Sequence, residues 1–163
     1  MRLFRPFPLL RLVYPEAIFR IRTDNKDLCL TFDDGPNPDS TQRILDILEA
    51  HNLNAIFFCN GEAAEKYPWL IALIISKGHI VGNHGYRHLN GWITNTQVYI
   101  NNVFKAAKFT SSNLFRPPYG RIRPPQFSEL KKIYRIVFWD LMPNDFDERM
   151  SSEKVLRVMK KKI

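Results

Sequence analysis

The sequence predicts one α/β domain built on a parallel sheet with crossover helices. Short, apolar, β-rich segments alternate along the chain with segments whose apolar residues have helical spacing. The length of 163 residues and the 45% hydrophobic content suffice for one hydrophobic core but not for two ordinary domains. Polar residues directly follow several expected strands, where parallel sheets bind ligands. We therefore expect a single domain over residues 1–163.

The expected strands are short apolar segments rich in β-branched, aromatic or other strand-forming residues. In chain order they are Leu28–Phe32, Ala55–Cys59, His79–Gly82, Leu114–Phe115 and Arg135–Asp140. Cys29 and Cys59 lie in two of them, so we expect both to be buried free thiols. A bridge between them is left open but is not predicted.

The segments between and after these strands have the periodicity of amphipathic helices. Thr41–Ala50 places apolar residues on one side after a cap at Asp39 and Ser40, and Tyr67–Ile74 has helical spacing with Gly78 as its stop. Further helices are expected near Thr96–Lys108, Pro125–Lys132 and Ser152–Lys162. The chain is thus organised as βα-like units without a low-complexity linker.

The first twenty residues are expected to be an apolar lead-in that packs over the first strand. Charged residues and prolines, among them Arg2, Pro6 and Arg11, interrupt it before a signal-peptide core or a membrane span could form. The sequence therefore predicts no transmembrane segment and no signal peptide. It places the protein in the cytoplasm by default and leaves the cell envelope open.

The net charge of +8 and the pI near 9.7 favour contact with an anionic partner. The basic residues are scattered, and the two lysine clusters, Lys131–Lys132 and Lys160–Lys162, are expected to be solvated helix faces. No zinc-finger or RNA-binding signature accompanies them. We therefore expect no nucleic-acid partner, and a basic nucleic-acid binder with a structural metal ranks last among the function hypotheses.

The main candidate for chemistry is a metal site made by residues far apart in the sequence. Asp33 and Asp34 end the first strand, and His84 and His88 follow the third. One carboxylate and two imidazoles suit a catalytic Zn²⁺ with an open position for water, so Asp34, His84 and His88 are the predicted ligands and Asp33 the predicted base. Because the histidines are four residues apart, we expect them to face the same way on a helical turn. The alternatives without a functional role are a simple Asp-Gly-Pro turn and a surface histidine pair.

A second candidate element is Arg116-Pro117-Pro118-Tyr119-Gly120, after the fourth strand. We expect Arg116 to pair with Asp33 and to orient it, while the stiff proline segment presents the backbone N–H of Tyr119 to an oxyanion. The alternative is a rigid loop with a solvated charge. His51 and His79 are expected to be structural or solvent-exposed and not ligands. Trp92 and Trp139 are expected to be core or rim aromatics, and neither by itself indicates sugar stacking.

These residues resemble the metal-dependent polysaccharide deacetylases, which are carbohydrate esterase family 4. Thr31-Phe32-Asp33-Asp34-Gly35-Pro36 matches the first family motif, His84-Gly85-Tyr86-Arg87-His88 keeps both histidines of the second, and Arg116-Pro117-Pro118-Tyr119-Gly120 matches the third. The resemblance runs from about Pro15 onward. It implies a distorted, incomplete (β/α) barrel with fewer than eight units.

The resemblance assigns the same roles that the residues suggest. It implies that Asp34, His84 and His88 bind the metal, Zn²⁺ or alternatively Co²⁺, that Asp33 is the catalytic base, and that Arg116 orients this base. It implies that Tyr119 donates its main-chain N–H to the oxyanion. In the fourth motif, Met142-Pro143-Asn144-Asp145-Phe146, only Asp145 is retained as a candidate catalytic residue, and Phe146 stands where the family has Trp. Gly85 replaces the usual Ser or Thr.

The chain ends before the family's Leu-x-His motif, so we expect a truncated chain that lacks the final strand and the general-acid histidine. The expected function is metal-dependent removal of N-acetyl groups from a polysaccharide or oligosaccharide containing N-acetylglucosamine. Peptidoglycan and chitin-like oligomers are the leading substrates. The alternative is a catalytically impaired carbohydrate-binding protein that uses the same metal-containing groove.

Overall fold

The structure, a computed structural model, describes residues 8–25, 27–143, 145, 147 and 149–160. It divides into two compact units. The larger unit is Thr23–Val137, and the smaller unit combines Met1–Arg22 with Phe138–Ile163. Residues 144, 146, 161 and 162, which the sequence analysis placed in the fourth motif and at the end of the last helix, lie outside the described residues. The one-domain organisation stays a prediction, as does the packing of the lead-in over the first strand.

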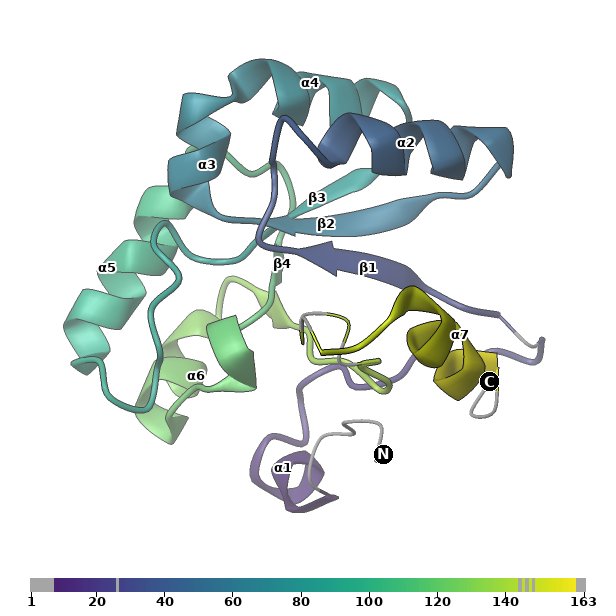
Figure 1. Cartoon of the computed structure of the whole chain (residues 1–163). Coiled ribbons are helices and arrows are strands. Elements are labelled where there is room, and N and C mark those ends of the chain that lie inside the picture. The colour runs from purple at the N-terminus through teal and green to yellow at the C-terminus, as the bar shows by residue number, and fades with distance from the viewer. Residues whose placement is uncertain (1–7, 26, 144, 146, 148, 161–163) are drawn as a thin grey trace. The chain divides into compact units, whose positions relative to one another are not determined.

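The larger unit is built on a five-stranded parallel sheet in the order β1-β2-β3-β4-β5, and Figure 1 labels its first four strands. The strands are β1 Leu30–Asp33, β2 Ala55–Cys59, β3 Ile80–Asn83, β4 Leu114–Phe115 and β5 Arg135–Ile136. Each strand pairs with its neighbour in sequence, which is the order of a (β/α) barrel and not of a doubly wound sheet. The predicted parallel α/β fold of barrel type is therefore confirmed.

The fifth strand is shorter than predicted. It ends at Ile136 and not at Asp140, and the N–H of Phe138 donates to the carbonyl of Ile18 in the smaller unit. The chain passes from the larger to the smaller unit at this point. In the apolar run Val137–Trp139, Val137 thus belongs to the larger unit and the other two residues to the smaller unit. Periodicity alone does not reveal this division.

The helices fall close to the predicted positions, with three additions. They are α1 Pro8–Val13, α2 Thr41–Ala50, α3 Gly61–Lys66, α4 Pro68–Ser76, α5 Thr96–Ala106, η1 Pro118–Gly120, α6 Pro124–Leu130 and α7 Ser152–Lys160. The sequence analysis did not predict α1, α3 and η1. The α3 segment, GEAAEK, has no large apolar residue and buries only Gly61 and Ala64, so it has no apolar stripe to detect.

The principal core cluster of the larger unit lies between the first three strands and the helices α2 and α4, which lie on the same side of these strands (Figure 1). Leu45 and Leu48 from α2 and Ile74 from α4 pack with Phe57 and Val81, and all five are at most 3% exposed. Burying a side chain of this size stabilises the fold by about 1.5–3 kcal/mol. This layer fixes the ends of β1, β2 and β3 relative to one another.

The sheet also curves, as a barrel requires. Arg116, directly after β4, donates hydrogen bonds to Thr31 and Asp33 on β1, although β2 and β3 lie between these strands in the sheet. The ring of Phe58 lies on the same inner side, beneath the Arg116 guanidinium. A Cβ on Gly82 would come within 2.6 Å of that ring, so glycine gives Phe58 its space.

The cysteines correct one expectation. Cys59 is buried in β2 as predicted, but Cys29 is exposed and precedes β1. The register pairs Leu30 with Ala55, so Cys29 lies before the paired region while Cys59 lies at the far end of β2. Both thiols are free, and a bridge between them is not formed.

The smaller unit packs aromatic rings around Phe138. The Phe19 ring stacks on it with centroids 4.8 Å apart, and Tyr14 lies on it at 6.2 Å. Arg11 and Arg20 both pair with Asp140. This unit also contains α7, whose basic residues are Lys154, Arg157 and Lys160.

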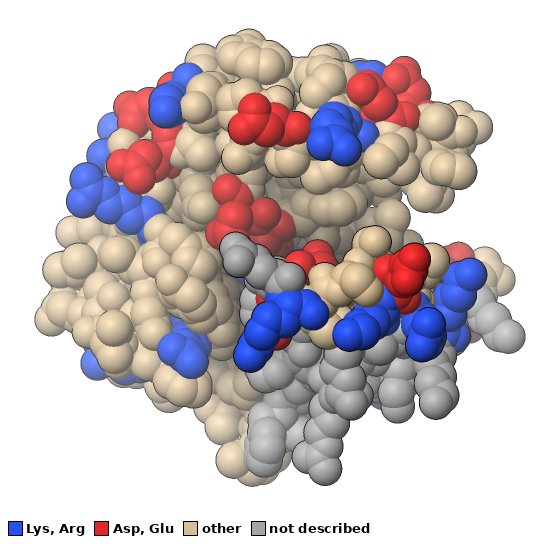
Figure 2. Space-filling model, in the orientation of Figure 1, with Lys and Arg blue, Asp and Glu red and all other residues tan. Residues whose placement is uncertain are grey.

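Charge is mixed over part of the surface of the larger unit. Figure 2 shows Lys and Arg side chains interspersed with Asp and Glu side chains over α2 and α3, and no continuous basic patch forms on that part of the face. This distribution agrees with the scattered basic residues of the sequence. No helix in the described ranges has the length and apolar character needed to cross a bilayer.

Candidate metal centre

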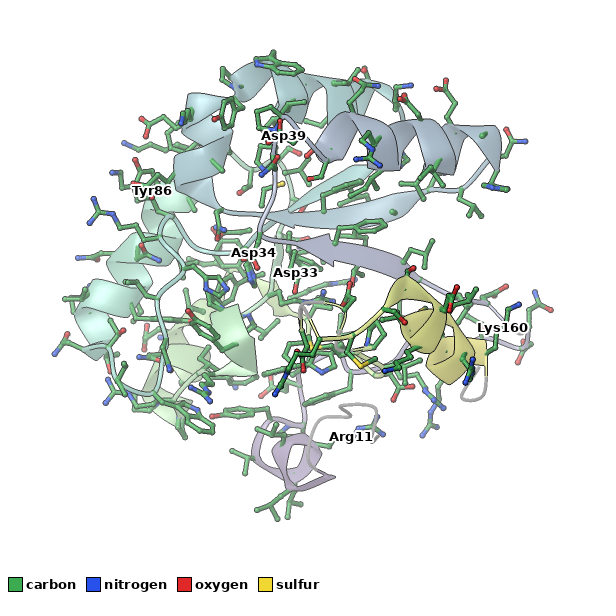
Figure 3. All side chains as sticks on the ribbon, viewed as in Figure 1. Arg11, Asp33, Asp34, Asp39, Tyr86 and Lys160 are labelled. Atoms are coloured by element: carbon green, nitrogen blue, oxygen red, sulfur yellow. The ribbon has the colours of Figure 1, made fainter. Side chains whose placement is uncertain are left out.

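The candidate residues come together because they follow neighbouring parallel strands. The sheet register pairs Asp33 with Phe58, and Asn83 with both Cys59 and Phe115. The residues that come next in the chain therefore meet at one edge of the sheet: Asp34, Asn60, His84 and Arg116. Figure 3 shows Asp33 and Asp34 at that end of β1.

Asp34 adopts an unusual backbone conformation with φ of +69°. This left-handed region is uncommon for a residue with a Cβ and often occurs at functional sites. The side chain is 62% exposed. Asn60 Nδ2 lies 3.3 Å from both the Asp34 carbonyl oxygen and its Oδ1, so it donates towards both acceptors. The sequence analysis gave Asn60 no role, and its position directly after β2 is the only signal that could have found it.

His84 and His88 meet across an irregular loop and not on a helical turn, which corrects the expectation from their spacing. Gly85 allows the bend with φ of +79°, and a Cβ there would lie 2.8 Å from Asn102 Nδ2. Asn102, on α5, holds the loop by accepting from the N–H of Arg87 and donating to its carbonyl, both at 2.9 Å. The loop is thus fixed by α5.

The ligand atoms of Asp34, His84 and His88 all lie within 4.8 Å of one another. Asp34 Oδ1 is 3.6 Å from His84 Nε2 and 3.2 Å from His88 Nε2. Tetrahedral ligands at 2.0–2.2 Å from Zn²⁺ are roughly 3.4 Å apart, so this spacing suits a common cation. The predicted triad is therefore brought together, and its residues fit a divalent metal.

The tautomer of His84 also suits a ligand. Its Nδ1 lies 2.8 Å from the Arg116 carbonyl, which can only accept, so Nδ1 carries the proton and Nε2 presents its lone pair. Burial lowers the pKa of His84, although Asp33 and Asp34 oppose this effect. A neutral imidazole whose other ring nitrogen donates to a fixed acceptor is the form that binds metal.

Arg116 and Asp33 form the predicted pair. Arg116 Nη1 donates to Asp33 Oδ1 and to Thr31 Oγ1, both at 2.7 Å. The Arg116 side chain is 4% exposed and that of Asp33 is 24% exposed. Burial lowers the pKa of Arg116, and the Asp33 carboxylate opposes that shift. Thr31, two residues before Asp33 on the same strand face, therefore helps to hold the guanidinium that orients Asp33.

Tyr119 lies in η1 with φ of +58°, another left-handed conformation. The residue is 56% exposed, and its ring packs edge-on against His88, with centroids 4.3 Å apart. The oxyanion role of its main-chain N–H stays a prediction. Asp145 is exposed and belongs to the smaller unit, so its catalytic role also stays a prediction.

The remaining histidines behave as expected. His51 is exposed, and His79 is buried, where its Nδ1 accepts from the N–H of Ala55 at 3.3 Å. Neither belongs to the described metal-ligand cluster, which consists of Asp34, His84 and His88.

Comparisons with known proteins agree with this geometry. The family model for polysaccharide deacetylase matches residues 20–134. The peptidoglycan-N-acetylglucosamine deacetylase of Bacillus cereus is 38% identical over 122 residues, which cover 71% of this chain and 44% of that protein. The peptidoglycan-N-acetylmuramic acid deacetylase PdaC of Bacillus subtilis is 33% identical over 146 residues, which cover 83% of this chain and 30% of that protein.

The solved structure of peptidoglycan deacetylase PdaC from Bacillus subtilis is similar to this one with a TM-score of 0.80 and 28% identity. The match covers 88% of this chain and 72% of that chain. The chain spans less than half the length of both curated relatives above.

Proposed function

This chain belongs to the polysaccharide deacetylase family, and from that premise we propose that it hydrolyses N-acetyl groups on the N-acetylglucosamine-type units of a polysaccharide. The products are acetate and a free amine. The observation that supports this proposal most directly is the convergence of Asp34, His84 and His88 beside the Asp33–Arg116 pair. Peptidoglycan is the leading substrate because both curated relatives are named for it. A wall polymer as substrate implies work in the cell envelope.

Asp34, His84 and His88 would hold a divalent cation, Zn²⁺ in the first place and Co²⁺ as the alternative. Two imidazoles and one carboxylate suit these ions, and three protein ligands leave a position open for water and substrate. Because the Asp34 side chain is exposed, this open position is accessible from solvent. When bound, such an ion lowers the pKa of a water molecule and polarises a carbonyl.

Asp33 would accept the proton of the attacking water. Its carboxylate is held in place by Arg116, which is itself fixed by Thr31 and by the Phe58 ring 4.2 Å below the guanidinium. Attack of the resulting hydroxide on the acetamide carbonyl gives a tetrahedral species whose negative oxygen the N–H of Tyr119 would stabilise. As this species collapses, the C–N bond breaks, the proton held by Asp33 would pass to the leaving nitrogen, and acetate and the amine are released.

The test is acetate release from N-acetylglucosamine oligomers and from peptidoglycan fragments, with and without a chelator. We expect release that the chelator abolishes and that added Zn²⁺ restores. Metal-dependent binding of the oligomers without acetate release would instead support the carbohydrate-binding alternative. Release that is unchanged in a chelated sample free of metal would contradict the proposal.

A further inference from the structure

We propose that Trp92, Arg121 and Tyr119 form a saccharide-binding surface beside the metal centre, and that Arg121 selects substrates that carry a carboxylate near the reacting sugar. This inference rests on the proposed deacetylase function and specifies its substrate class. We call this set of residues the Trp92–Arg121 surface.

A series of ring contacts connects this surface to the metal ligands. The ring of Tyr119 packs against His88 with centroids 4.3 Å apart. The Arg121 guanidinium carbon lies 5.8 Å from the Tyr119 ring and 4.9 Å from the Trp92 ring. The Tyr119 ring therefore contacts both Arg121 and the metal ligand His88. A sugar next to the reacting unit would come within reach of Arg121.

Both rings are available for contact, because Trp92 and Tyr119 are each 56% exposed. Such large aromatic surfaces beside a site suit the apolar C–H faces of sugar rings, as exposed apolar surface often marks a binding site. The two rings also hold the Arg121 guanidinium by cation–π contacts, which do not neutralise its charge.

The loop that carries Trp92 is fixed from below by a buried side chain. Gln126, which is 0% exposed, donates from Nε2 to the carbonyls of Gly91 at 2.9 Å and Thr94 at 3.2 Å. A Cβ on Gly91 would lie 2.3 Å from the carbonyl oxygen of Arg121, so the two backbone segments touch. The Trp92–Arg121 surface is therefore preorganised before a ligand arrives, which lowers the entropic cost of binding.

The charge of Arg121 indicates what the surface would bind. Arg116 is buried against Asp33, whereas Arg121 is exposed, and within the described part of the chain no carboxylate pairs with it. A fixed, uncompensated guanidinium matches the fork geometry of a carboxylate. A neutral N-acetylglucosamine oligomer offers no such group, whereas a carboxylate-bearing glycan does.

The test compares the native chain with Arg121→Gln and with Arg43→Gln. Arg43 is an exposed arginine on α2, so its replacement makes the same change in net charge away from the site. The substrates are a neutral N-acetylglucosamine oligomer, a glycan with a carboxylate on the sugar, and a glycan whose only carboxylate is on an attached peptide. Steady-state acetate release and calorimetric binding to the Zn²⁺-loaded protein are both measured.

We expect Arg121→Gln to lower kcat/KM on a carboxylate-bearing glycan by about 5- to 10-fold through KM, the size of one exposed charge-assisted contact. The change on the neutral oligomer should stay below about 2-fold, and the preference should weaken at high salt. Arg43→Gln should leave the preference unchanged. The glycan on which the Arg121 effect appears identifies the sugar or the peptide as the source of the carboxylate.

An equal loss on all three glycans, or a native chain with no preference for carboxylate, overturns the inference. The binding measurement keeps it separate from the proposed reaction. If no acetate is released, a preference for carboxylate in binding that disappears in Arg121→Gln still supports the Trp92–Arg121 surface. Absence of binding to every glycan overturns it.

Discussion

Replacing Asp33 by asparagine should separate catalysis from metal binding and from folding. The amide nitrogen and oxygen cannot take a proton from water at neutral pH, so the proposed base is lost. General-base catalysis contributes about 10²- to 10⁴-fold, and we expect kcat to fall by that factor, or by roughly 3–5 kcal/mol of transition-state stabilisation. Metal binding should persist, because Asp33 is outside the ligand set of Asp34, His84 and His88.

The structure also sets the expected change in stability. Removing one partner of a fully buried ion pair costs about 3–5 kcal/mol. Here the Asp33 side chain is 24% exposed, and the amide oxygen of D33N can still accept the hydrogen bond that Arg116 donates. We therefore expect a loss of only about 1–2 kcal/mol, the difference between a charge-assisted and a neutral hydrogen bond. For a chain of this length that corresponds to a fall of roughly 2–8 °C in Tm.

The assay combines acetate release from N-acetylglucosamine oligomers, bound metal after dialysis, and thermal unfolding. His84→Ala is the matched control, because it removes a ligand and should lose the metal and the activity together. If D33N keeps more than about a tenth of the native turnover, Asp33 is not the base. If D33N loses the metal as His84→Ala does, it is wrong that Asp33 lies outside the set of metal ligands.

Two further predictions concern other parts of the larger unit. Cys29 is exposed, whereas burial, with a smaller contribution from Asp33, raises the pKa of Cys59 to about 12. A charged thiol reagent at pH 8 should therefore label one cysteine in the folded protein and both after denaturation, and rapid labelling of Cys59 in the folded state would contradict its burial. Gly91→Ala should lower the free energy of unfolding by about 1–3 kcal/mol, because the new Cβ would lie 2.3 Å from the Arg121 carbonyl oxygen and the backbone would have to shift. An unchanged Tm would show that the close contact between the backbones of Gly91 and Arg121 does not limit the residue at position 91.

Much of the sheet could be predicted from the sequence because its signals are local. Ala55–Cys59 and Leu114–Phe115 were expected as strands and are strands, since each is a short apolar run between polar segments. Thr41–Ala50 likewise has its predicted bounds, because its apolar residues repeat at helical spacing. Residue type and the position after a strand were also enough to select Asp34, His84 and His88 as a cluster.

Other features depend on residues that have no local signal. The α3 helix buries only Gly61 and Ala64, and the histidine pair meets in a loop because Asn102, on a separate helix, holds the chain there. Their spacing of four residues suggested a helical turn, but this spacing alone does not distinguish a helix from a bend held by another element.

The amino-acid sequence by itself determined the positions of most of the strands, the ligand types and the likeness to a deacetylase family, because these follow from the order and chemistry of neighbouring residues. Tertiary structure alone decided that Asn60 contacts Asp34, that Thr31 shares a guanidinium with Asp33, and that Arg121 lies against Trp92. These partners are separated by as many as 85 residues. Only the curvature of the sheet and the packing of its loops bring such residues together, and no local pattern encodes that approach.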